Sequence, residues 1–97
     1  MKPDGTLGAA RVFVDGAGWT ANGPGVADGL EVDAAGNVFG TGPGGIYVFS
    51  PRGELLGRMV TGVKTANLEW GDDGSTLYIT ADSTLRRVRL TTKGKGF

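Results

Sequence analysis

Short runs of valine, leucine, isoleucine and aromatic residues recur along the whole chain, and glycine, proline or aspartate separates nearly all of them. Short apolar runs bounded by turn residues predict β-strands. The pattern predicts no helix and eight strands, at residues 11–15, 29–33, 38–41, 45–50, 56–61, 67–70, 76–81 and 84–90. Because the connections are short, neighbouring strands should pair as a meander, and the expected fold class is all-β.

The glycine-rich stretch GTGPGG at residues 40–45 fits the spacing G-x-G-x-x-G of dinucleotide-binding loops. That motif holds a pyrophosphate only where its glycines lead from a strand into the N-terminus of a helix. Here the next residues are IYVFS at 46–50, which predict a second strand. Pro43 cannot donate to a sheet ladder, and the glycines beside it allow the positive φ angles of a reversal. We therefore expect a hairpin and not a nucleotide site.

An internal repeat links the two halves of the chain. LEVDAAGN at residues 30–37 aligns with LEWGDDGS at 68–75, at an offset of 38 residues, and each copy leads into further strands. A repeat of roughly forty residues and four strands is typical of a propeller blade. The expected organisation is a partial β-propeller over residues 1–97, with one blade at 28–61, a second at 66–90, and residues 11–15 as a strand of a neighbouring blade.

Composition limits the chemistry that the chain can perform. Its 97 residues contain no Cys and no His, which excludes a disulfide framework, a thiolate metal site and the commonest general base. Carboxylates, amides, hydroxyls, lysine or a metal held by oxygen remain. No apolar run approaches the ~20 residues of a membrane span, and the first residues do not resemble a signal peptide. We expect a soluble, cytoplasmic chain that does not bind membranes.

Basic residues are concentrated near the C-terminal end, at Arg86, Arg87, Arg89, Lys93 and Lys95. Nucleic-acid binding would call for a basic surface with aromatic platforms, but no aromatic residue is interleaved with these charges, and the net charge of the chain is zero. A solvated strand edge is the simpler interpretation, because charged edge strands resist unwanted pairing. We expect no nucleic-acid partner.

Three segments resemble the C-terminal third of the gluconolactonase-like family, the lactonases related to senescence marker protein and regucalcin. They are PDGTL at residues 3–7, GVADGLEVDAAGNVFGTGPGGIYVFSPRGELLG at 25–57 and TANLEWGDDGSTLYITADSTLRRVRL at 65–90. The resemblance implies a six-bladed β-propeller, whereas this chain supplies about two four-stranded blades. Two blades leave open strand edges in water. Three copies would supply six blades, so the resemblance implies a homotrimer that closes as a ring.

The resemblance also implies metal-dependent hydrolysis of a small sugar lactone at the mouth of the propeller channel. In the family a glutamate, an asparagine and an aspartate hold a divalent cation, and the aspartate lies in a Pro-Asp-Gly stretch. Asp28 matches that aspartate, with Ala27 in place of the proline, whereas the family's glutamate and asparagine have no counterpart. Asp28 is thus the expected metal ligand and the catalytic proton acceptor or donor. The cation would polarise the lactone carbonyl, and oxygen ligands admit calcium, magnesium, manganese or zinc.

Two further residues are candidates for this site: Asn67 as a second metal ligand and Trp19 as a substrate contact. Each candidate also has a structural interpretation, with Asp28 as an ordinary Asp-Gly turn, Asn67 as a turn amide and Trp19 as blade packing. Glu31 and Glu69 occupy equal positions in the repeat and are expected to pair with arginine, because a buried carboxylate needs a partner. The alternative function is a non-catalytic propeller fragment used in assembly or ligand binding.

Overall fold

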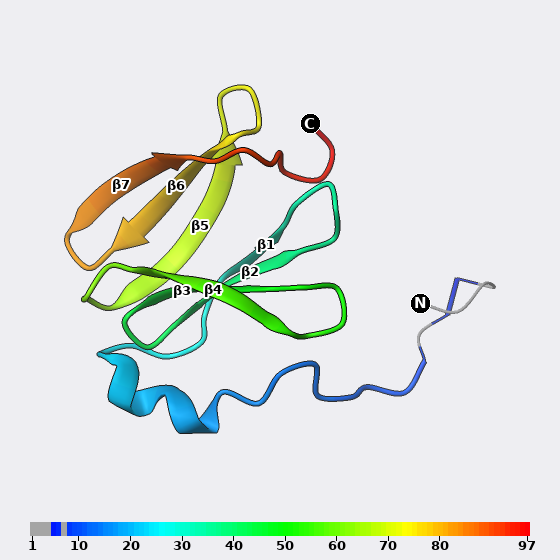
Figure 1. The fold of residues 1–97 in the computed structure, drawn as a ribbon, viewed down its shortest axis with the longest axis horizontal. Coiled ribbons are helices and arrows are strands. Elements are labelled where there is room, and N and C mark those ends of the chain that lie inside the picture. The colour runs from blue at the N-terminus through cyan, green and yellow to red at the C-terminus, as the bar shows by residue number, and fades with distance from the viewer. Residues whose placement is uncertain (1–4, 7) are drawn as a thin grey trace.

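The computed structural model describes residues 5, 6 and 8–97, so three residues of the PDGTL stretch lie outside the described part. The strands form two antiparallel sheets in which strand order follows the sequence (Figure 1). The first sheet contains β1 (Leu30–Val32), β2 (Val38–Gly42), β3 (Gly45–Phe49) and β4 (Leu55–Val60), and the second contains β5 (Thr65–Gly71), β6 (Thr76–Ala81) and β7 (Thr84–Arg89). The all-β class and seven of the predicted strands are confirmed.

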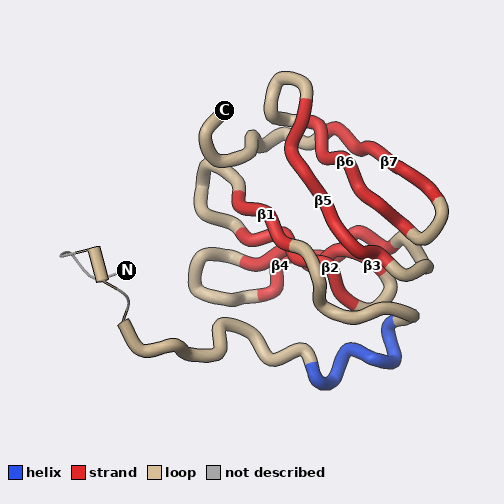
Figure 2. The backbone as a smooth tube through the Cα atoms, turned by 180° about the vertical axis from the view of Figure 1, so that it is seen from behind, coloured by secondary structure: helices blue, strands red, loops and turns tan. Residues whose placement is uncertain are grey.

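Two expectations about the strands are corrected. Residues 11–15 form no strand within the single chain, because none of their backbone amides or carbonyls bonds to another described backbone group, and a strand needs such a ladder. They lead instead into a short 3₁₀ helix, η1 (Ala17–Asn22), which the sequence pattern did not predict (Figure 2). The expectation of four strands in each blade holds for the first sheet only, since the second has three.

The glycine-rich stretch forms the expected hairpin. Gly42 pairs with Gly45 across a two-residue turn that joins β2 to β3. Gly44 and Gly45 adopt φ angles of 83° and 156°, which a residue with a side chain rarely adopts. A Cβ at Gly45 would also collide with the carbonyl oxygen of Met59 on β4. Because a strand follows these glycines where a phosphate-binding loop would need a helix, the hairpin prediction is confirmed.

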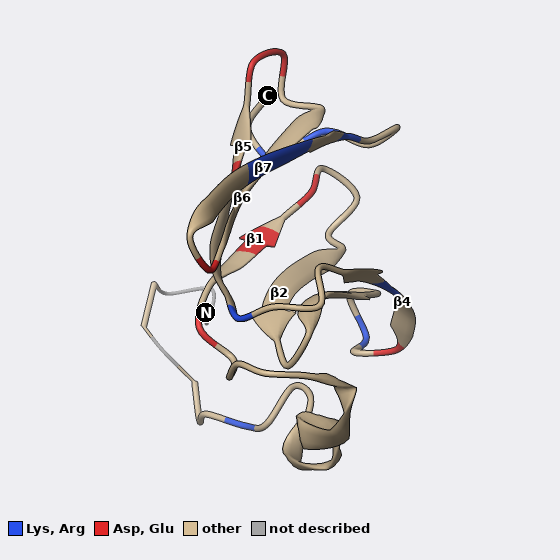
Figure 3. Ribbon diagram, turned by 90° about the vertical axis from the view of Figure 1, so that its left-hand side faces the viewer, with Lys and Arg blue, Asp and Glu red and all other residues tan. Residues whose placement is uncertain are grey.

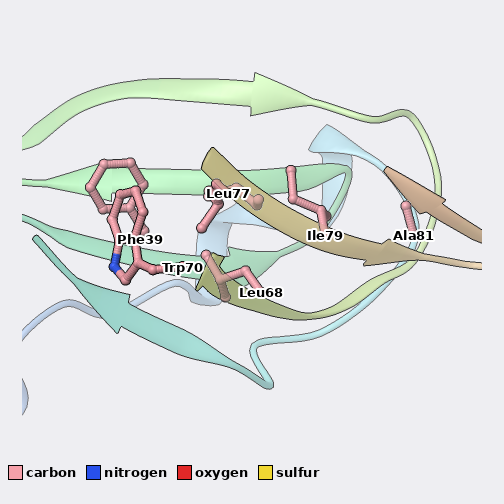
Figure 4. Packing of buried hydrophobic residues seen from close by; sticks show 7 residues of the cluster. Phe39, Leu68, Trp70, Leu77, Ile79 and Ala81 are labelled. Carbon is pink, nitrogen blue, oxygen red and sulfur yellow. The ribbon is translucent and has the colours of Figure 1, made fainter. Parts of the chain in front are cut away.

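The hydrophobic core lies between the two sheets. Phe39 and Ile46 contribute from the first sheet, and Leu68, Trp70, Leu77, Ile79 and Ala81 contribute from the second (Figure 4). The Trp70 ring meets the Phe39 ring edge-on at 5.3 Å, and its indole N–H donates to the Val32 carbonyl at 3.1 Å. Burial of these rings is the main source of cohesion between sheets that share no strand.

The opposite face of the first sheet is covered by the chain that precedes it. Trp19 of η1 stacks on Tyr47 at 4.2 Å and lies 5.6 Å from Phe49, while Phe13 meets Phe49 edge-on at 6.4 Å. The Tyr47 hydroxyl donates to the Pro43 carbonyl and accepts from the Asn22 side chain. Tertiary contacts of this kind stabilise the short 3₁₀ helix, whose sequence has no helical periodicity of its own.

After β7 the chain crosses back to the first sheet and joins it to the second. The Ala34 amide donates to the Lys93 carbonyl at 2.7 Å, and the Lys95 amide donates to the Val32 carbonyl at 2.9 Å. Gly94 forms a bridge with Asp33, and its missing side chain leaves room for the Trp70 indole. The returning segment therefore holds the two sheets together at one end. Among the described residues, no helix is long and apolar enough to cross a membrane.

Candidate functional site

Asp28 stands immediately before β1, where the Thr41 hydroxyl fixes the backbone. The amides of Asp28 and Gly29 donate to Thr41 Oγ1 at 3.1 and 2.9 Å, and the Thr41 amide donates to the Gly29 carbonyl at 2.8 Å. Thr41 itself is buried. The Asp28 side chain is exposed, and its carboxylate accepts no hydrogen bond from any residue in the described part of the chain. A rigid backbone thus presents a carboxylate with all its lone pairs available.

Asn67 lies beside this turn, on the inner strand of the second sheet. A Cβ at Gly29 would collide with the Asn67 side-chain oxygen, so glycine permits the close approach of the two inner strands. The structure therefore brings Asn67 next to the residue that follows Asp28. The Asn67 amide oxygen accepts the Leu68 amide at 2.9 Å, so it bonds to the backbone of β5 beside the register shift of that strand and not to a turn.

Trp19 and Asp28 line the same cavity, which has a volume of about 370 Å³. Its walls are mainly apolar and include Val12, Phe13 and Phe49. Trp19 is half-buried, because one face of its indole is occupied by Tyr47 and Phe49. Asn67 does not line this cavity, so the three predicted site residues fall into two adjoining places rather than one.

The donor atoms around Asp28 do not make a complete cation site within one chain. Divalent cations of the calcium or magnesium type take about six or more oxygen ligands. Asp28 supplies one carboxylate, and the nearby Asn67 oxygen already accepts a backbone amide. Within the described residues, no three His, Cys, Asp or Glu side chains are grouped so that they could hold a metal ion. The described part of a single chain therefore does not fit the cation that the family resemblance implies.

Glu31 and Glu69 face each other across the inner strands β1 and β5, and neither forms an ion pair with arginine within the described part of the chain. The expected arginine pairing is thus wrong. Burial raises the pKa of Glu31, and the nearby Glu69 carboxylate raises it further through its charge and a hydrogen bond between the two side chains. The sequence showed only that Glu31 and Glu69 occupy equal positions in the repeat. Their proximity depends on the contact between β1 and β5, which the folded structure determines.

Thr41 is the site residue that sequence reasoning missed. It lies on β2, directly opposite Ile46, where a strand pattern predicts an ordinary half-buried position. Its role depends on contact with residues 28 and 29, which precede it by more than ten positions and whose approach only the folded sheet determines. No local sequence signal identifies such a hydroxyl.

Comparison with known proteins places this geometry in a family. A family model described as the SMP-30/gluconolactonase/LRE-like region matches residues 1–83. Over 72 residues the chain is 43% identical to a gluconolactonase of Zymomonas mobilis subsp. mobilis, a match that covers 72% of this chain and 20% of that protein.

An X-ray structure of a proposed gluconolactonase is also similar, with a TM-score of 0.69 and 38% sequence identity over 73% of this chain and 25% of that chain. The chain thus spans a quarter or less of the length of these relatives, and its two sheets match part of a propeller. Because the family model covers most of its residues, the chain belongs to the SMP-30/gluconolactonase/LRE-like family.

Proposed function

We propose that this chain contributes the Asp28 region of a site that hydrolyses small sugar lactones, and that residues outside the single chain complete the site. The observation that carries the proposal is the exposed Asp28 carboxylate, held on a clamped backbone at a mainly apolar cavity. The similarity to gluconolactonases supports the same assignment, but it extends over only a fifth of the curated relative.

The residues of this chain suggest a division of roles. Hydrolysis adds water to the lactone carbonyl, breaks the ring C–O bond and leaves a hydroxy acid. In this proposal the Asp28 carboxylate accepts a proton from the attacking water and returns it to the ring oxygen that leaves. The indole of Trp19 and the apolar wall provide a surface for the C–H face of a sugar ring.

The missing ligands make a homotrimer part of the proposal. Three chains with two sheets each would form a ring of six, and the symmetry axis would bring three copies of Asp28 to one mouth. Carboxylates that approach one another repel unless they are protonated or bridged by a cation. A calcium, magnesium, manganese or zinc ion would therefore be held between copies, with the second lone pair of the Asn67 oxygen, beside its bond to the Leu68 amide, as a further ligand.

Hydrolysis of gluconolactone by the purified chain tests the function directly, with spontaneous hydrolysis subtracted and with a chelator in parallel. We expect chelator-sensitive turnover that Asp28→Asn abolishes. Asp82→Asn is the matched control, because Asp82 is an exposed aspartate in the β6–β7 turn and its carboxylate makes no hydrogen bond to the described residues. Turnover that survives in Asp28→Asn, or that the control variant also loses, would contradict the assignment.

A non-catalytic role in assembly or ligand binding is the second candidate. It is favoured by the incomplete donor set around Asp28 within the described chain. The two candidates differ in one measurable respect, since only the enzyme accelerates lactone opening. Absence of turnover in a preparation that native mass spectrometry shows to be a homotrimer would favour the non-catalytic role.

A further inference from the structure

The outer edge of β7 is open in this chain, although the repeat provides a strand at the equivalent place. In the first sheet β3 pairs with β2 on one side and with β4 on the other, whereas β7 pairs with β6 alone among the described residues. The chain after β7 does not return to fill this place, because Lys93 and Lys95 are hydrogen-bonded to the first sheet. The second sheet therefore lacks the strand that would correspond to β4.

Within the described part of the chain, residues 11–15 lack a partner strand, just as the outer edge of β7 does. Their sequence, RVFVD, is a short β-branched and aromatic run between two charged residues, yet none of their backbone amides or carbonyls bonds to another part of the described backbone. Val12 is 77% exposed and Phe13 is 46% exposed. An extended, unpaired and partly apolar segment is well suited to add to a sheet edge.

Within one chain this segment and the open edge lie on opposite sides of the molecule. Phe13 packs on Phe49 at the far face of the first sheet, while β7 is the outer strand of the second sheet (Figure 1). The segment cannot reach β7 of its own chain without leaving the first sheet. We propose that residues 11–15 of a second copy pair with β7 and supply the fourth strand of the second sheet.

Side-chain pattern selects one register for this pairing. All strand pairs of the structure are antiparallel, so we take the same direction for the added strand. Val88 and Leu90 point toward the core, whereas Arg87 and Arg89 point away from it. With Val14 opposite Val88, Val12 falls opposite Leu90 and both valines extend the apolar core.

Charge supports the same register. Val14 opposite Val88 places the Asp15 carboxylate opposite the Arg87 guanidinium, and β7 is a largely basic strand (Figure 3). Arg87 is exposed and has no ion-pair partner within the described residues. A shift by two residues would move Phe13 opposite Arg87 and Arg11 opposite Arg89. Repulsion between the two arginines disfavours this shifted register.

The register also leaves Phe13 on the side of the added strand that faces its own first sheet, where it meets Phe49. One copy can therefore keep its own contacts while it completes the sheet of its neighbour. Since donor and acceptor surfaces differ, the contact is head-to-tail and closes into a ring when the rotation fits. This is the contact through which the homotrimer proposed above would form.

Paired cysteines test the register directly, because the natural chain has no Cys. Val14→Cys combined with Val88→Cys should give disulfide-linked multimers on mild oxidation, which a reductant returns to single chains. Directly opposite residues lie within reach of a disulfide, whereas diagonal neighbours do not. Val14→Cys combined with Arg86→Cys is the shifted control and should give no linked multimers. Chains that stay single in the matched variant, or equal linkage in the control, would overturn the proposal.

A charge exchange provides a second test that needs no core substitution. Asp15 and Arg87 are both exposed. Asp15→Arg and Arg87→Asp should each weaken association about fivefold per contact by native mass spectrometry, and the combined variant should restore it. Failure of the combined variant to recover would overturn the register. Both experiments measure the masses of assemblies and not turnover. The proposed contact can therefore fail while lactone hydrolysis is retained, and hydrolysis can be lost while the contact is confirmed.

Discussion

Asp33 and Thr92 are 59 residues apart in the chain, yet the Thr92 hydroxyl donates a hydrogen bond of 2.9 Å to the Asp33 carboxylate. The same carboxylate accepts the amides of Ala35 and Asn37 and the Asn37 side chain. Asp33 is only 1% exposed, so these donors replace the water that the charge would otherwise bind. This buried carboxylate joins the returning C-terminal segment to the first sheet.

Replacement of Asp33 by alanine should therefore be costly. It leaves buried donors without an acceptor, and we expect the free energy of unfolding to fall by about 3 kcal/mol in urea titrations. Asp73→Ala is the control, because the Asp73 carboxylate is exposed and its bonds to Ser75 and Arg89 can be replaced by water. We expect the control to lose much less stability than Asp33→Ala, because water screens and replaces exposed interactions. If the two variants lose equal free energy of unfolding, the hydrogen bonds to Asp33 stabilise the fold no more than the exposed bonds of Asp73 do.

The same bonds predict a dependence of stability on pH. Burial alone would raise the pKa of Asp33, but the hydrogen bonds from Asn37, Thr92 and Ala35 outweigh it and hold the pKa below its ordinary value. A lowered carboxyl pKa adds stability above about pH 4, and this stability is lost as the pH falls through the folded-state value. Wild type should lose more stability than Asp33→Asn between pH 5 and acid extremes near pH 2. If the free energies of unfolding of the two proteins fall equally with pH, the prediction is wrong.

Glu31 should behave in the opposite sense. Its raised pKa means that the folded state binds a proton more tightly than the unfolded chain, so the penalty appears as the pH rises above the ordinary carboxyl range. Glu31→Gln should thus raise the free energy of unfolding at pH 7, by up to about 1 kcal/mol, and have little effect at pH 4. Glu54→Gln, at an exposed turn, should have no effect at either pH. A loss of stability in Glu31→Gln at pH 7 would show that the pair is not repulsive.

The strands, the hairpin and the repeat could be predicted because each depends on neighbours in sequence. Val38 and Phe49 belong to short apolar runs, and Pro43 with its flanking glycines marks the reversal between them. The 3₁₀ helix could not be predicted, since Trp19 is held there by stacking on a sheet residue 28 positions later. The contact of Asp33 with Thr92 also depends on the path of the folded chain.

For the candidate site, the sequence could name candidate residues but not the contacts that surround them. The family resemblance identified Asp28, but neither composition nor spacing could show that Thr41 clamps its backbone or that Gly29 touches Asn67. These contacts arise where two inner strands of different sheets approach each other. Sequence reasoning therefore named Asp28 as the candidate carboxylate and missed the groups that position its backbone.

The close approach of Gly29 to Asn67 predicts a large effect of a small substitution. Gly29→Ala adds a methyl group that meets both the side chain and the backbone of Asn67, and we expect a loss of about 1 to 3 kcal/mol in the free energy of unfolding. Gly57→Ala is the matched control on β4, where a Cβ meets no atom within 4 Å. Alanine there should be neutral or slightly stabilising. If Gly29→Ala is also neutral, the inner strands are not in tight contact.

The cation proposal makes a prediction about stability that does not depend on turnover. A ligand that binds only the folded assembly stabilises it by about 2.7 kcal/mol at a hundredfold excess over its dissociation constant. Calcium or magnesium should therefore raise the thermal unfolding midpoint of wild type and of the control Asp82→Asn, but not that of Asp28→Asn. In chelator, Asp28→Asn should have a higher thermal unfolding midpoint than wild type. Removal of the Asp28 carboxylates relieves repulsion between copies, while the bonds from the backbone to Thr41 remain. If the cation raises the midpoint of Asp28→Asn as much as that of wild type, the ion binds elsewhere and Asp28 is not its ligand.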